Sequence, residues 1–417
     1  MAKLIIEGPS KLQGEIFIHG AKNSTLPLLA AAMLCSTDCV LHNCPVLSDV
    51  DTAVKILQYL GCKISRTGSD LLINSSSLCS SDIPDFLMRE MRSSIVFLGA
   101  IITRAGQAKL SFPGGCEIGP RPIDLHLWAL RKMGVIIEEN HGCLDCKTTG
   151  RLNGANIGFS FPSVGATENV MIAASCAKGT TIITNAAREP EICDLANFLN
   201  ECGAKISGAG QSTIVIEGVS SLTGCEHYVI PDRIAATTFM TIAAITGSTL
   251  LISNINPNHL EPIIPVFEEA GCQLKILDSQ IQIVAPRRLN RVKSIRTMPY
   301  PGFPTDAQAP VMAMTTLANG TSVFVENIFE SRYKHVGELL RLGANIKVEG
   351  RVAVVEGVQR LSGAPVEAAD LRGAAALVAA GLAAEGITQI SGLKHLDRGY
   401  ETIENSLTSI GASVKRI

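Results

Sequence analysis

"VKILQYLGCKI", Val54 to Ile64, is the stretch that decides the fold of this chain. Apolar residues recur at helical spacing up to Leu60, and Gly61 follows where a helix C-cap needs a left-handed residue. A short run of β-like residues comes directly after the glycine. The stretch therefore predicts an amphipathic helix that ends at a glycine and turns back as a strand.

The same phrase recurs five more times along the chain. The six glycines are Gly61, Gly134, Gly203, Gly271, Gly343 and Gly411, and they are separated by 73, 69, 68, 72 and 68 residues. Such a near-constant period indicates a repeat architecture. Between the copies lies a second recurring element, a helix rich in small residues that is followed by a Gly-Thr or Gly-Ser turn and a strand, as in VMIAASCAKGTTIITN (Val170–Asn185).

Alanine-rich helices without a polar face are buried, so each repeat predicts a strand, a buried helix, a strand, an outer helix and a strand pair. Six such βαβαββ units predict an α/β protein of two similar halves, with helices inside and sheets outside. The first strand, residues 3–18, is expected to pair with the C-terminal half, and Tyr228–Ile234 is expected to hold a second crossover. The predicted domains are therefore residues 21–229, and residues 1–20 together with 230–417.

The composition argues against several classes of function. The 36 Lys and Arg against 38 Asp and Glu give a formal net charge of −2, so no overall field draws this chain to nucleic acid or to an anionic membrane. Its apolar runs are shorter than the ~20 residues of a membrane span, and its start lacks a signal-peptide core, which predicts a cytoplasmic protein. The 13 cysteines are typical of free thiols in a reducing compartment. The one CxxC, Cys143 to Cys146, has no second pair, so no metal site is expected there.

Cations stand at the expected starts of many helices. They are Lys22, Arg92, Arg121, Arg188, Arg233, Arg332, Arg372 and Arg398. A cation at a helix N-terminus is unfavourable for the helix dipole by itself, so the repeated pattern predicts a bound anion such as a phosphate or a carboxylate. The alternative for any single arginine is an ion pair with a neighbouring Asp or Glu.

Two carboxylates share these positions. Asp306, in PGFPTDAQAP, has the polar character of an ordinary helix N-cap together with Thr305. Among cations it would be ionised and able to act as a base. Asp370, two residues before Arg372, is expected either to pair with an arginine or to contact substrate.

One thiol differs from the others. Cys116 lies in FPGGCEIGPRPIDLH (Phe112–His126), where glycines and prolines predict a shaped loop that closes over substrate. A nearby helix start would lower the pKa of this thiol, whereas a cysteine elsewhere is usually a small buried hydrophobe.

The motifs GAKNSTLP, PGGCEIGPRPIDLH, PSVGATEN, NAAREPEI, PDRIAATTF, PGFPTDAQ, ENIFESRYKHV, DLRGAAALV and HLDRGYETIE closely resemble those of the enolpyruvyl transferases of the UDP-N-acetylglucosamine 1-carboxyvinyltransferase family, over the entire chain. The resemblance implies an inside-out α/β barrel of two three-unit domains with the active site between them. It implies transfer of the enolpyruvyl group of phosphoenolpyruvate to the 3-hydroxyl of UDP-N-acetylglucosamine, the first committed step of peptidoglycan synthesis. It implies no metal and no organic cofactor, small-molecule substrates as the partners, and a monomer.

The resemblance also assigns roles by motif. Lys22, Arg121 and Arg398 would hold phosphoenolpyruvate, with Arg92 and Arg372 nearby, and Asp306 would take the sugar hydroxyl proton. Cys116 would donate a proton to C3 and be the target of the epoxide fosfomycin. The residues expected to contact the UDP-sugar are Asn23, Arg92, Arg121, Pro122, Asp124, Leu125, Ser163, Val164, Gly165, Asp306 and Ile328.

One position departs from the family. Some members carry a lysine where this chain has Phe161, so a cation toward the diphosphate is missing here. Three alternatives stay open: the related transferase that acts on shikimate 3-phosphate, a protein like the RNA 3-phosphate cyclases, and an inactive paralogue. The low aromatic content argues against RNA binding, and the presence of Lys22, Cys116, Asp306 and Arg398 argues against inactivity.

Overall fold

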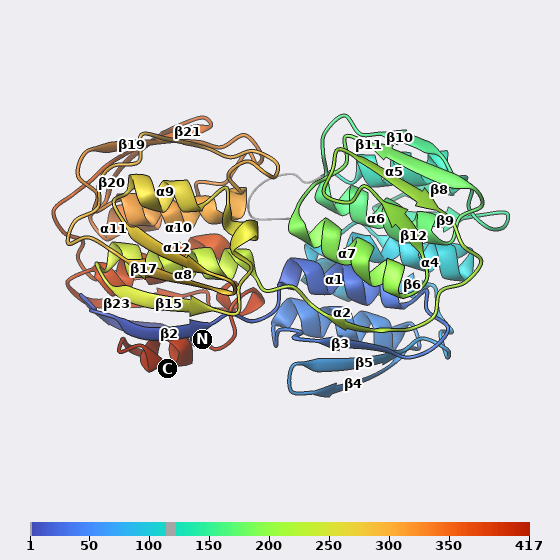
Figure 1. The fold of residues 1–417 in the computed structure, drawn as a ribbon, viewed down its shortest axis with the longest axis horizontal. Coiled ribbons are helices and arrows are strands. Elements are labelled where there is room, and N and C mark those ends of the chain that lie inside the picture. The colour runs from blue at the N-terminus through green and yellow to red at the C-terminus, as the bar shows by residue number, and fades with distance from the viewer. Residues whose placement is uncertain (1, 114–121) are drawn as a thin grey trace. The chain divides into compact units, whose positions relative to one another are not determined.

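The computed structural model describes residues 2–113 and 122–417 (Figure 1). The described chain divides into two units. The N-terminal unit comprises residues 20–113 and 122–230, and the C-terminal unit comprises residues 2–19 and 231–417. Each unit encloses a hydrophobic core of its own.

Over its described residues, the N-terminal unit contains three four-stranded sheets. In spatial order, the first sheet consists of β14 (Glu226–Tyr228), β3 (Cys39–His42), β5 (Asp70–Asn74) and β4 (Lys63–Thr67). The second consists of β6 (Asp82–Ile83), β7 (Gln107–Ser111), β9 (Cys143–Lys147) and β8 (Ile136–Asn140). The third consists of β10 (Asn156–Gly158), β11 (Thr180–Thr184), β13 (Thr213–Glu217) and β12 (Lys205–Ser207).

The described residues of the C-terminal unit repeat this arrangement. Its first sheet consists of β16 (Gln273–Leu277), β17 (Gln280–Val284), β15 (Thr249–Ser253) and β2 (Gln13–Phe17). The second consists of β18 (Ser294–Arg296), β19 (Thr321–Val325), β21 (Val352–Glu356) and β20 (Asn345–Glu349). The third consists of β22 (Pro365–Glu367), β23 (Gly386–Ser391), β1 (Leu4–Gly8) and β24 (Ser413–Arg416). In all six sheets one outer strand runs parallel to its neighbour and the other pairs are antiparallel.

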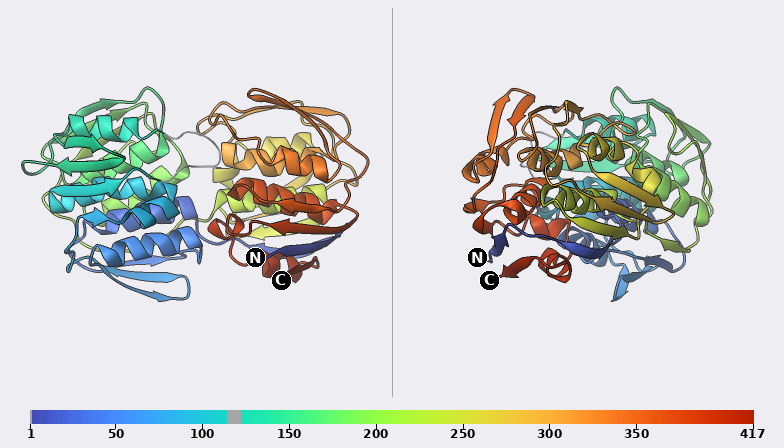
Figure 2. Two further views of the ribbon diagram at one scale, coloured as in Figure 1. Left: turned by 180° about the vertical axis from the view of Figure 1, so that it is seen from behind. Right: turned by 60° about the vertical axis from the view of Figure 1, so that its left-hand side comes forward.

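Helices fill the inside of each unit, as the repeat predicts. The inner helices are α1 (Lys22–Ala32), α4 (Phe97–Ala105) and α6 (Val164–Ser175) in the N-terminal unit, and α8 (Arg233–Ile245), α10 (Thr305–Thr315) and α12 (Leu371–Ala383) in the C-terminal unit. Figure 2 shows the same layering from behind, with strands outside the helices of each unit. All residues of α8 are buried, and its Thr237 and Thr238 hydroxyls donate to carbonyls one turn back, which satisfies polar atoms that burial would otherwise penalise.

Shorter or more amphipathic helices complete the units. They are α2 (Ser48–Tyr59), α3 (Asp85–Glu90), α5 (Asp124–Lys132), α7 (Pro190–Glu201), α9 (Ile264–Glu269), α11 (Val336–Arg341) and α13 (Ile403–Ser409), with the 3-10 helices η1 (Arg92–Val96), η2 (Pro257–Leu260) and η3 (Leu396–Arg398). No helix within the described ranges combines the length and the apolar character that crossing a bilayer requires.

The six repeat glycines have the predicted conformation. Each has a positive φ between 91° and 103°, at the end of an outer helix and before a strand. The prediction of six left-handed helix ends is therefore confirmed, and the strand that follows each glycine is the edge strand of its sheet.

The N-terminal segment differs from its prediction in one respect. Residues 3–18 form two strands, β1 and β2, because the chain leaves β1 at Pro9, which has no backbone N–H to donate to a ladder. Strand β1 pairs with β23 and β24, and β2 pairs with β15, so the segment pairs with the C-terminal half as expected. The first strands of two repeats are also exchanged, since β2 precedes α1 but pairs with β15, and β14 precedes α8 but pairs with β3.

Candidate active site

The predicted site residues are distributed over both units. The N-terminal unit holds Lys22, Asn23, Arg92, Pro122, Asp124, Leu125, Ser163, Val164 and Gly165, and the C-terminal unit holds Asp306, Ile328, Arg372 and Arg398. Cys116 and Arg121 lie outside the described residues, so the expectations for the loop thiol and for that arginine stay predictions.

Several predicted cations do stand at helix starts. Lys22, Arg233 and Arg372 lie in the first turns of α1, α8 and α12, Arg92 opens η1, and Arg188 precedes α7 by two residues. The expectation was wrong for two others. Arg332 lies in a turn four residues before α11, and Arg398 ends η3 rather than beginning a helix. Their segments contain short turns that sequence periodicity does not separate from helix starts.

Lys22 is held by an acidic partner that the sequence did not reveal. Its Nζ lies 3.0 Å from Oδ2 of Asp49, in the first turn of α2, and both side chains are at most one-tenth exposed. A buried ammonium needs such a partner, since desolvation of an unpaired charge is costly. Asp49 therefore fixes the position of the Lys22 charge at the start of α1, next to the half-buried Asn23.

A cavity of about 720 Å³ lies in the N-terminal unit, and it gathers four of the predicted residues. Its lining comprises Arg92, Phe112, Pro122, Ile123, Asp124, Leu125, Leu127, Trp128, Arg131, Glu139, Gly158 and Ser160. The lining is largely apolar, with two guanidinium groups and two carboxylates among its polar groups. Arg92 also donates from Nη1 to the carbonyl oxygen of Pro113 at 3.2 Å, which holds its side chain beside Phe112.

The buried side chain of Asn169 organises the walls of this cavity. It donates from Nδ2 to the carbonyl of Ile95 in η1 at 2.9 Å and to Nδ1 of His126 in α5 at 3.0 Å, and its Oδ1 accepts from the N–H of Gly99 in α4 at 2.6 Å. Burial and the charge of Arg92 lower the pKa of His126 to about 4, so the ring is neutral near pH 7 and its Nδ1 can accept this bond. Asn169 thus joins the helices that begin with Arg92 and Asp124 to α6.

The start of α6 lies against the same wall. Ser163 caps this helix by accepting from the N–H of Ala166 at 3.4 Å. A Cβ atom at Gly165 would lie 3.1 Å from the ring of His126, so the absence of a side chain lets α6 approach α5 closely. The first N–H groups of an α-helix have no acceptor inside the helix, which makes the Ser163–Gly165 turn suitable for an anionic group.

In the C-terminal unit, Asp306 is clamped between two arginines. Its Oδ1 lies 3.0 Å from Nη2 of Arg332, and its Oδ2 lies 3.1 Å from Nη2 of Arg372. The arginine side chains are only 3% and 4% exposed, whereas that of Asp306 is 27% exposed. The expected N-cap role is therefore wrong: Pro304 precedes the helix, and Asp306 lies in the first turn of α10 as the counter-ion of two buried guanidinium groups.

The buried Arg372 has further partners. Burial opposes its charge, but Asp306 and the neighbouring Tyr400 and Asp232 outweigh this and raise the pKa of Arg372. Its Nη1 donates to Oη of Tyr400 at 3.4 Å, and Tyr400 also hydrogen-bonds Oγ1 of Thr238 at 2.7 Å. Asp370 caps α12 by accepting from the backbone N–H groups of Arg372 and Gly373 at 3.0 Å. The expectation that it contacts substrate stays a prediction.

Glu326 connects Ile328 to the Asp306 clamp. This carboxylate is 1% exposed and accepts from Oγ1 of Thr305 at 3.1 Å. It also accepts from the N–H groups of Ile328 and Phe329 at 2.9 and 3.1 Å. The turn that carries the half-buried Ile328 is thereby tied to the first residue of α10, directly before Asp306.

Arg398 lies on a turn that packs on the start of α12. A Cβ atom at Gly399 would lie 2.8 Å from the methyl groups of Leu371, so a larger residue there would require the Leu371 side chain to move. Tyr400, one residue further, contacts Arg372. The structure therefore places Arg398 on the same turn as a direct neighbour of the clamp.

Sequence reasoning missed the residues that hold the site residues in place. Asp49, Asn169, Glu326 and Tyr400 act through contacts with residues distant in sequence, and no local pattern marks such partners. Trp128 and Phe112 were also missed as cavity residues, although both flank or belong to the quoted Phe112–His126 stretch. The two cysteines of the CxxC motif do not face one another, since Cys143 is exposed and Cys146 is buried on β9, where residues three apart face opposite sides.

The chain matches one protein family over nearly its whole length. The family model described as EPSP synthase (3-phosphoshikimate 1-carboxyvinyltransferase) matches residues 6–407. UDP-N-acetylglucosamine 1-carboxyvinyltransferase 2 of Caldanaerobacter subterraneus subsp. tengcongensis is 52% identical over 417 residues, which cover both chains completely. UDP-N-acetylglucosamine 1-carboxyvinyltransferase 1 of Symbiobacterium thermophilum is 47% identical over 420 residues, covering this chain completely and 95% of the relative.

Solved structures show the same fold. The enolpyruvyl transferase NikO from Streptomyces tendae superimposes with a TM-score of 0.91 at 24% identity, covering 100% of this chain and 98% of that one. EPSP synthase from Acinetobacter baumannii superimposes with a TM-score of 0.79 at 17% identity, covering 100% and 99%. The chain therefore belongs to the EPSP synthase (3-phosphoshikimate 1-carboxyvinyltransferase) family of enolpyruvyl transferases, as a relative of the UDP-N-acetylglucosamine 1-carboxyvinyltransferases.

Proposed function

We propose that this protein transfers the enolpyruvyl group of phosphoenolpyruvate to the 3-hydroxyl of UDP-N-acetylglucosamine and releases phosphate. The observation that carries the proposal is full-length identity of 52% and 47% to enzymes named for this reaction. In the first step the hydroxyl oxygen bonds to C2 of phosphoenolpyruvate while a proton adds to C3. In the second step C3 loses a proton, the bond from C2 to the phosphate oxygen breaks, and the double bond re-forms.

Asp306 is proposed to take the proton of the sugar hydroxyl. Two guanidinium groups keep this carboxylate ionised, and its side chain is more exposed than either arginine, so a hydroxyl can reach it. The same two arginines also weaken it as a base. An anionic substrate that accepts a hydrogen bond from Arg372 would release Oδ2 of Asp306, so binding of phosphoenolpyruvate would raise the basicity of the carboxylate when it is needed.

The cations are proposed to bind phosphoenolpyruvate. Lys22, Arg92, Arg121, Arg372 and Arg398 are the candidates, because phosphate and carboxylate groups carry nearly all of the charge of this substrate. Hydrogen bonds hold three of these cations in place: Lys22 donates to Asp49, Arg92 to the carbonyl of Pro113, and Arg372 to the hydroxyl of Tyr400. Lys22 and Arg398 are also proposed as catalytic groups that stabilise charge as phosphate leaves.

The cavity of the N-terminal unit is proposed to take part of the UDP-sugar. Its volume lies within the ~300–1,000 Å³ of typical small-molecule sites. Pro122, Leu125 and Trp128 offer apolar surface for a flat base, and the Ser163–Gly165 turn offers N–H groups to a diphosphate. Asn23, Asp124, Asp306 and Ile328 are proposed to contact the sugar end. Phe161 is 43% exposed at the position where some relatives carry lysine, so less positive charge faces the diphosphate here.

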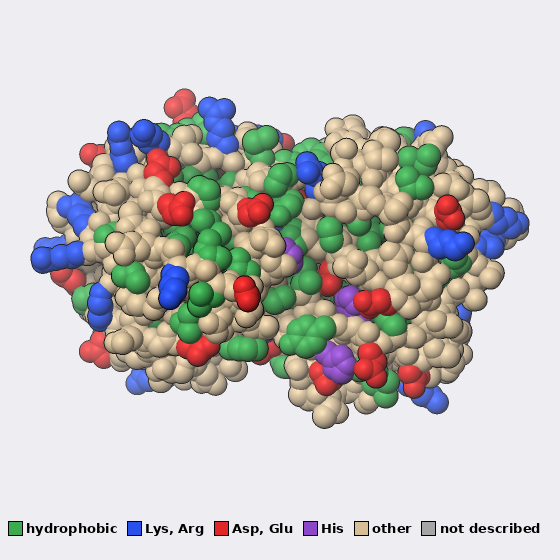
Figure 3. Space-filling view, in the orientation of Figure 1, with side chains coloured by type: hydrophobic (Ala, Val, Ile, Leu, Met, Phe, Trp, Pro, Cys, Tyr) green, Lys and Arg blue, Asp and Glu red, His purple; other side chains and the backbone are tan. Residues whose placement is uncertain are grey.

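The remaining expectations complete the proposal. Cys116 is proposed to donate the proton to C3 and to react with fosfomycin. The protein is proposed to act in the cytoplasm as a monomer in peptidoglycan synthesis, which links it to cell-wall biogenesis, cell shape and cell division, and to need no cofactor. Figure 3 shows basic and acidic side chains interspersed on the visible face of each unit, which fits small-molecule substrates better than a nucleic acid.

The related reaction on shikimate 3-phosphate is the second candidate, because the matching family model carries its name. Mass spectrometry of the product distinguishes the two. The full-length protein is incubated with phosphoenolpyruvate and an equimolar mixture of UDP-N-acetylglucosamine and shikimate 3-phosphate. We expect the enolpyruvyl ether of UDP-N-acetylglucosamine alone, and enolpyruvyl shikimate 3-phosphate as the sole product would reverse the assignment.

A further inference from the structure

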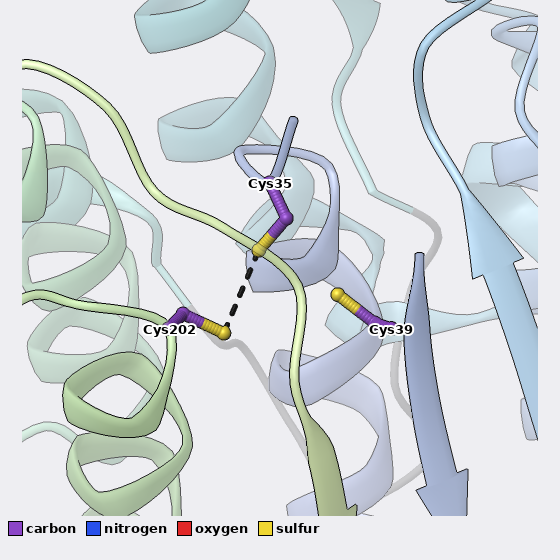
Figure 4. Close-up of side chains that lie close together, drawn as sticks. All are labelled: Cys35, Cys39 and Cys202. Carbon is purple, nitrogen blue, oxygen red and sulfur yellow. Dashed lines mark hydrogen bonds between the residues drawn. The ribbon is translucent and has the colours of Figure 1, made fainter. Parts of the chain in front are cut away.

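Three cysteines of the N-terminal unit gather into one cluster, and a fourth, Cys225, lies at its edge. The Sγ atoms of Cys35, Cys39 and Cys202 all lie within 4.8 Å of one another, and Figure 4 shows them pointing toward a common centre. The Sγ of Cys202 is 3.6 Å from that of Cys35 and 3.4 Å from that of Cys225. Because Cys39 and Cys202 are 163 positions apart, no local sequence pattern predicts this cluster.

These separations match those of a thiolate-bound ion. Zinc bonds to cysteine sulfur at about 2.3 Å in tetrahedral geometry, which places the sulfur atoms about 3.8 Å apart. A disulfide bond is about 2.05 Å long, so the contacts of 3.4 and 3.6 Å are those of unbonded sulfur atoms. A site made only of thiolates selects soft or borderline cations such as zinc over magnesium or calcium.

The backbone around the cluster is fixed by hydrogen bonds that do not involve the thiols. The N–H of Val40, next to Cys39, donates to the carbonyl of Cys225 at 2.9 Å. The N–H of Thr223 donates to the carbonyl of Cys202 at 2.9 Å, and Oγ of Ser75 donates to the carbonyl of Cys35 at 2.7 Å. The sulfur atoms of Cys35, Cys39 and Cys202 are therefore placed by the turn after α1, the start of β3 and the end of α7 before any ion binds.

Access and surroundings also suit a metal ion. Cys35, Cys39 and Cys202 are at most 1% exposed, whereas Cys225 is half-buried and leaves a route from solvent. Oε2 of Glu201 lies 3.9 Å from Sγ of Cys225 and 2.6 Å from Nδ1 of His227. These two side chains are the polar neighbours that would orient the outermost ligand.

We propose that Cys35, Cys39 and Cys202 bind one zinc ion as thiolates, and that Cys225, whose sulfur lies 3.4 Å from that of Cys202, moves to complete the tetrahedron as the fourth ligand. Each thiol loses a proton as its sulfur bonds to the ion, so the site releases four protons and gains a net charge of −2 with zinc. The ion would connect the turn after α1 and the start of β3 to the end of α7 and to β14. This structural site does not depend on the proposed reaction.

The test measures metal in the purified full-length protein. After dialysis against a weak chelator, we expect one equivalent of zinc by mass spectrometry of the elements. Cobalt titrated into the metal-free protein should give the intense thiolate-to-cobalt absorption, and zinc should displace it. Substoichiometric metal together with no cobalt absorption would overturn the proposal, as would a Cys202–Cys225 disulfide in protein that was alkylated before digestion.

Variants locate the site. Loss of a ligand should weaken zinc binding at least about 100-fold in Cys39→Ser and Cys202→Ser, since even neighbours of ligands alter affinity 10- to 100-fold. Cys62→Ser, which removes another buried thiol of this unit, and Cys143→Ser, which removes an exposed one, should keep one equivalent. If Cys39→Ser or Cys202→Ser fails to fold, the zinc affinity of Cys225→Ser, at the half-buried position, is compared with that of the wild type instead. Zinc affinity that is unchanged in every cluster variant that folds contradicts the assignment.

Discussion

Nη2 of Arg372 lies 3.1 Å from Oδ2 of Asp306, and this contact joins the starts of α12 and α10. The other carboxylate oxygen of Asp306 is bound equally closely by Arg332. The side chain of Asp306 is 27% exposed, whereas its two counter-ions are buried. This arrangement underlies the proposed role of Asp306 in proton transfer.

Asp306→Asn should lower kcat by a factor of about 10² to 10⁴, as for loss of a general base, while substrates still bind. Trp128 is the one tryptophan of the chain and lines the cavity, so its fluorescence reports nucleotide-sugar binding in the variant. The exposed Asp278→Asn is the matched control and should behave as the wild type. A kcat within twofold of wild type in Asp306→Asn would mean that the base lies elsewhere.

Cys116→Ser should weaken turnover and give resistance to fosfomycin, because the thioether to the epoxide can no longer form. Cys176→Ser is the control, since burial raises the pKa of the Cys176 thiol and so leaves it protonated and unreactive near pH 7. Time courses of inactivation with each variant measure the effect. Equal sensitivity of the two variants would remove Cys116 from the proposed mechanism.

The buried Glu168 should lower the free energy of unfolding as the pH rises. Burial, together with Glu191 and Glu189, raises the pKa of Glu168 to about 8 from an ordinary value near 4.5. Between these values the folded state holds a proton that the unfolded state has lost, so stability falls with rising pH until about pH 8 and then levels off.

Glu168→Gln removes this dependence. The variant should match the wild type near pH 4 and exceed it at pH 8 by on the order of 4 kcal/mol in unfolding free energy. Urea unfolding at several pH values measures the difference. A constant difference between the two proteins over pH 4–8 would show that Glu168 does not titrate in this range.

Two glycines of one repeat should respond in opposite ways to alanine. Gly343 ends α11 at φ 91°, and a Cβ there meets nothing within 4 Å, so Gly343→Ala introduces backbone strain alone. It should cost about 1–2 kcal/mol. Gly337 is exposed within the same helix, also with open space, so Gly337→Ala should stabilise by about 0.5–1 kcal/mol. Thermal unfolding measures both, and equal shifts would contradict the conformational argument.

The repeat was readable from the sequence because its signals are local. A helix that ends at Gly61 or Gly343 can be predicted from about a dozen neighbouring residues. The alanine-rich composition of helices such as α12 predicts that they are buried. The exchange of β2 and β14 could not be read in this way, because their pairing with β15 and β3 depends on residues more than 180 positions away.

The same limit applies to the site. The positions of Lys22 and Arg372 at helix starts could be predicted because nearby residues determine where a helix begins. Their partners, Asp49 and Asp306, are 27 and 66 residues away, and only folding brings each pair together. The thiols around Cys202 are also brought together only by folding, and the sequence does not distinguish them from the other cysteines.

Release of inorganic phosphate tests the central claim most directly. The full-length protein with phosphoenolpyruvate should release phosphate continuously when UDP-N-acetylglucosamine is present, and release should stop after treatment with fosfomycin. Without an acceptor, or with shikimate 3-phosphate instead, we expect no continuous release. Turnover with shikimate 3-phosphate alone, or none with UDP-N-acetylglucosamine, would contradict the account.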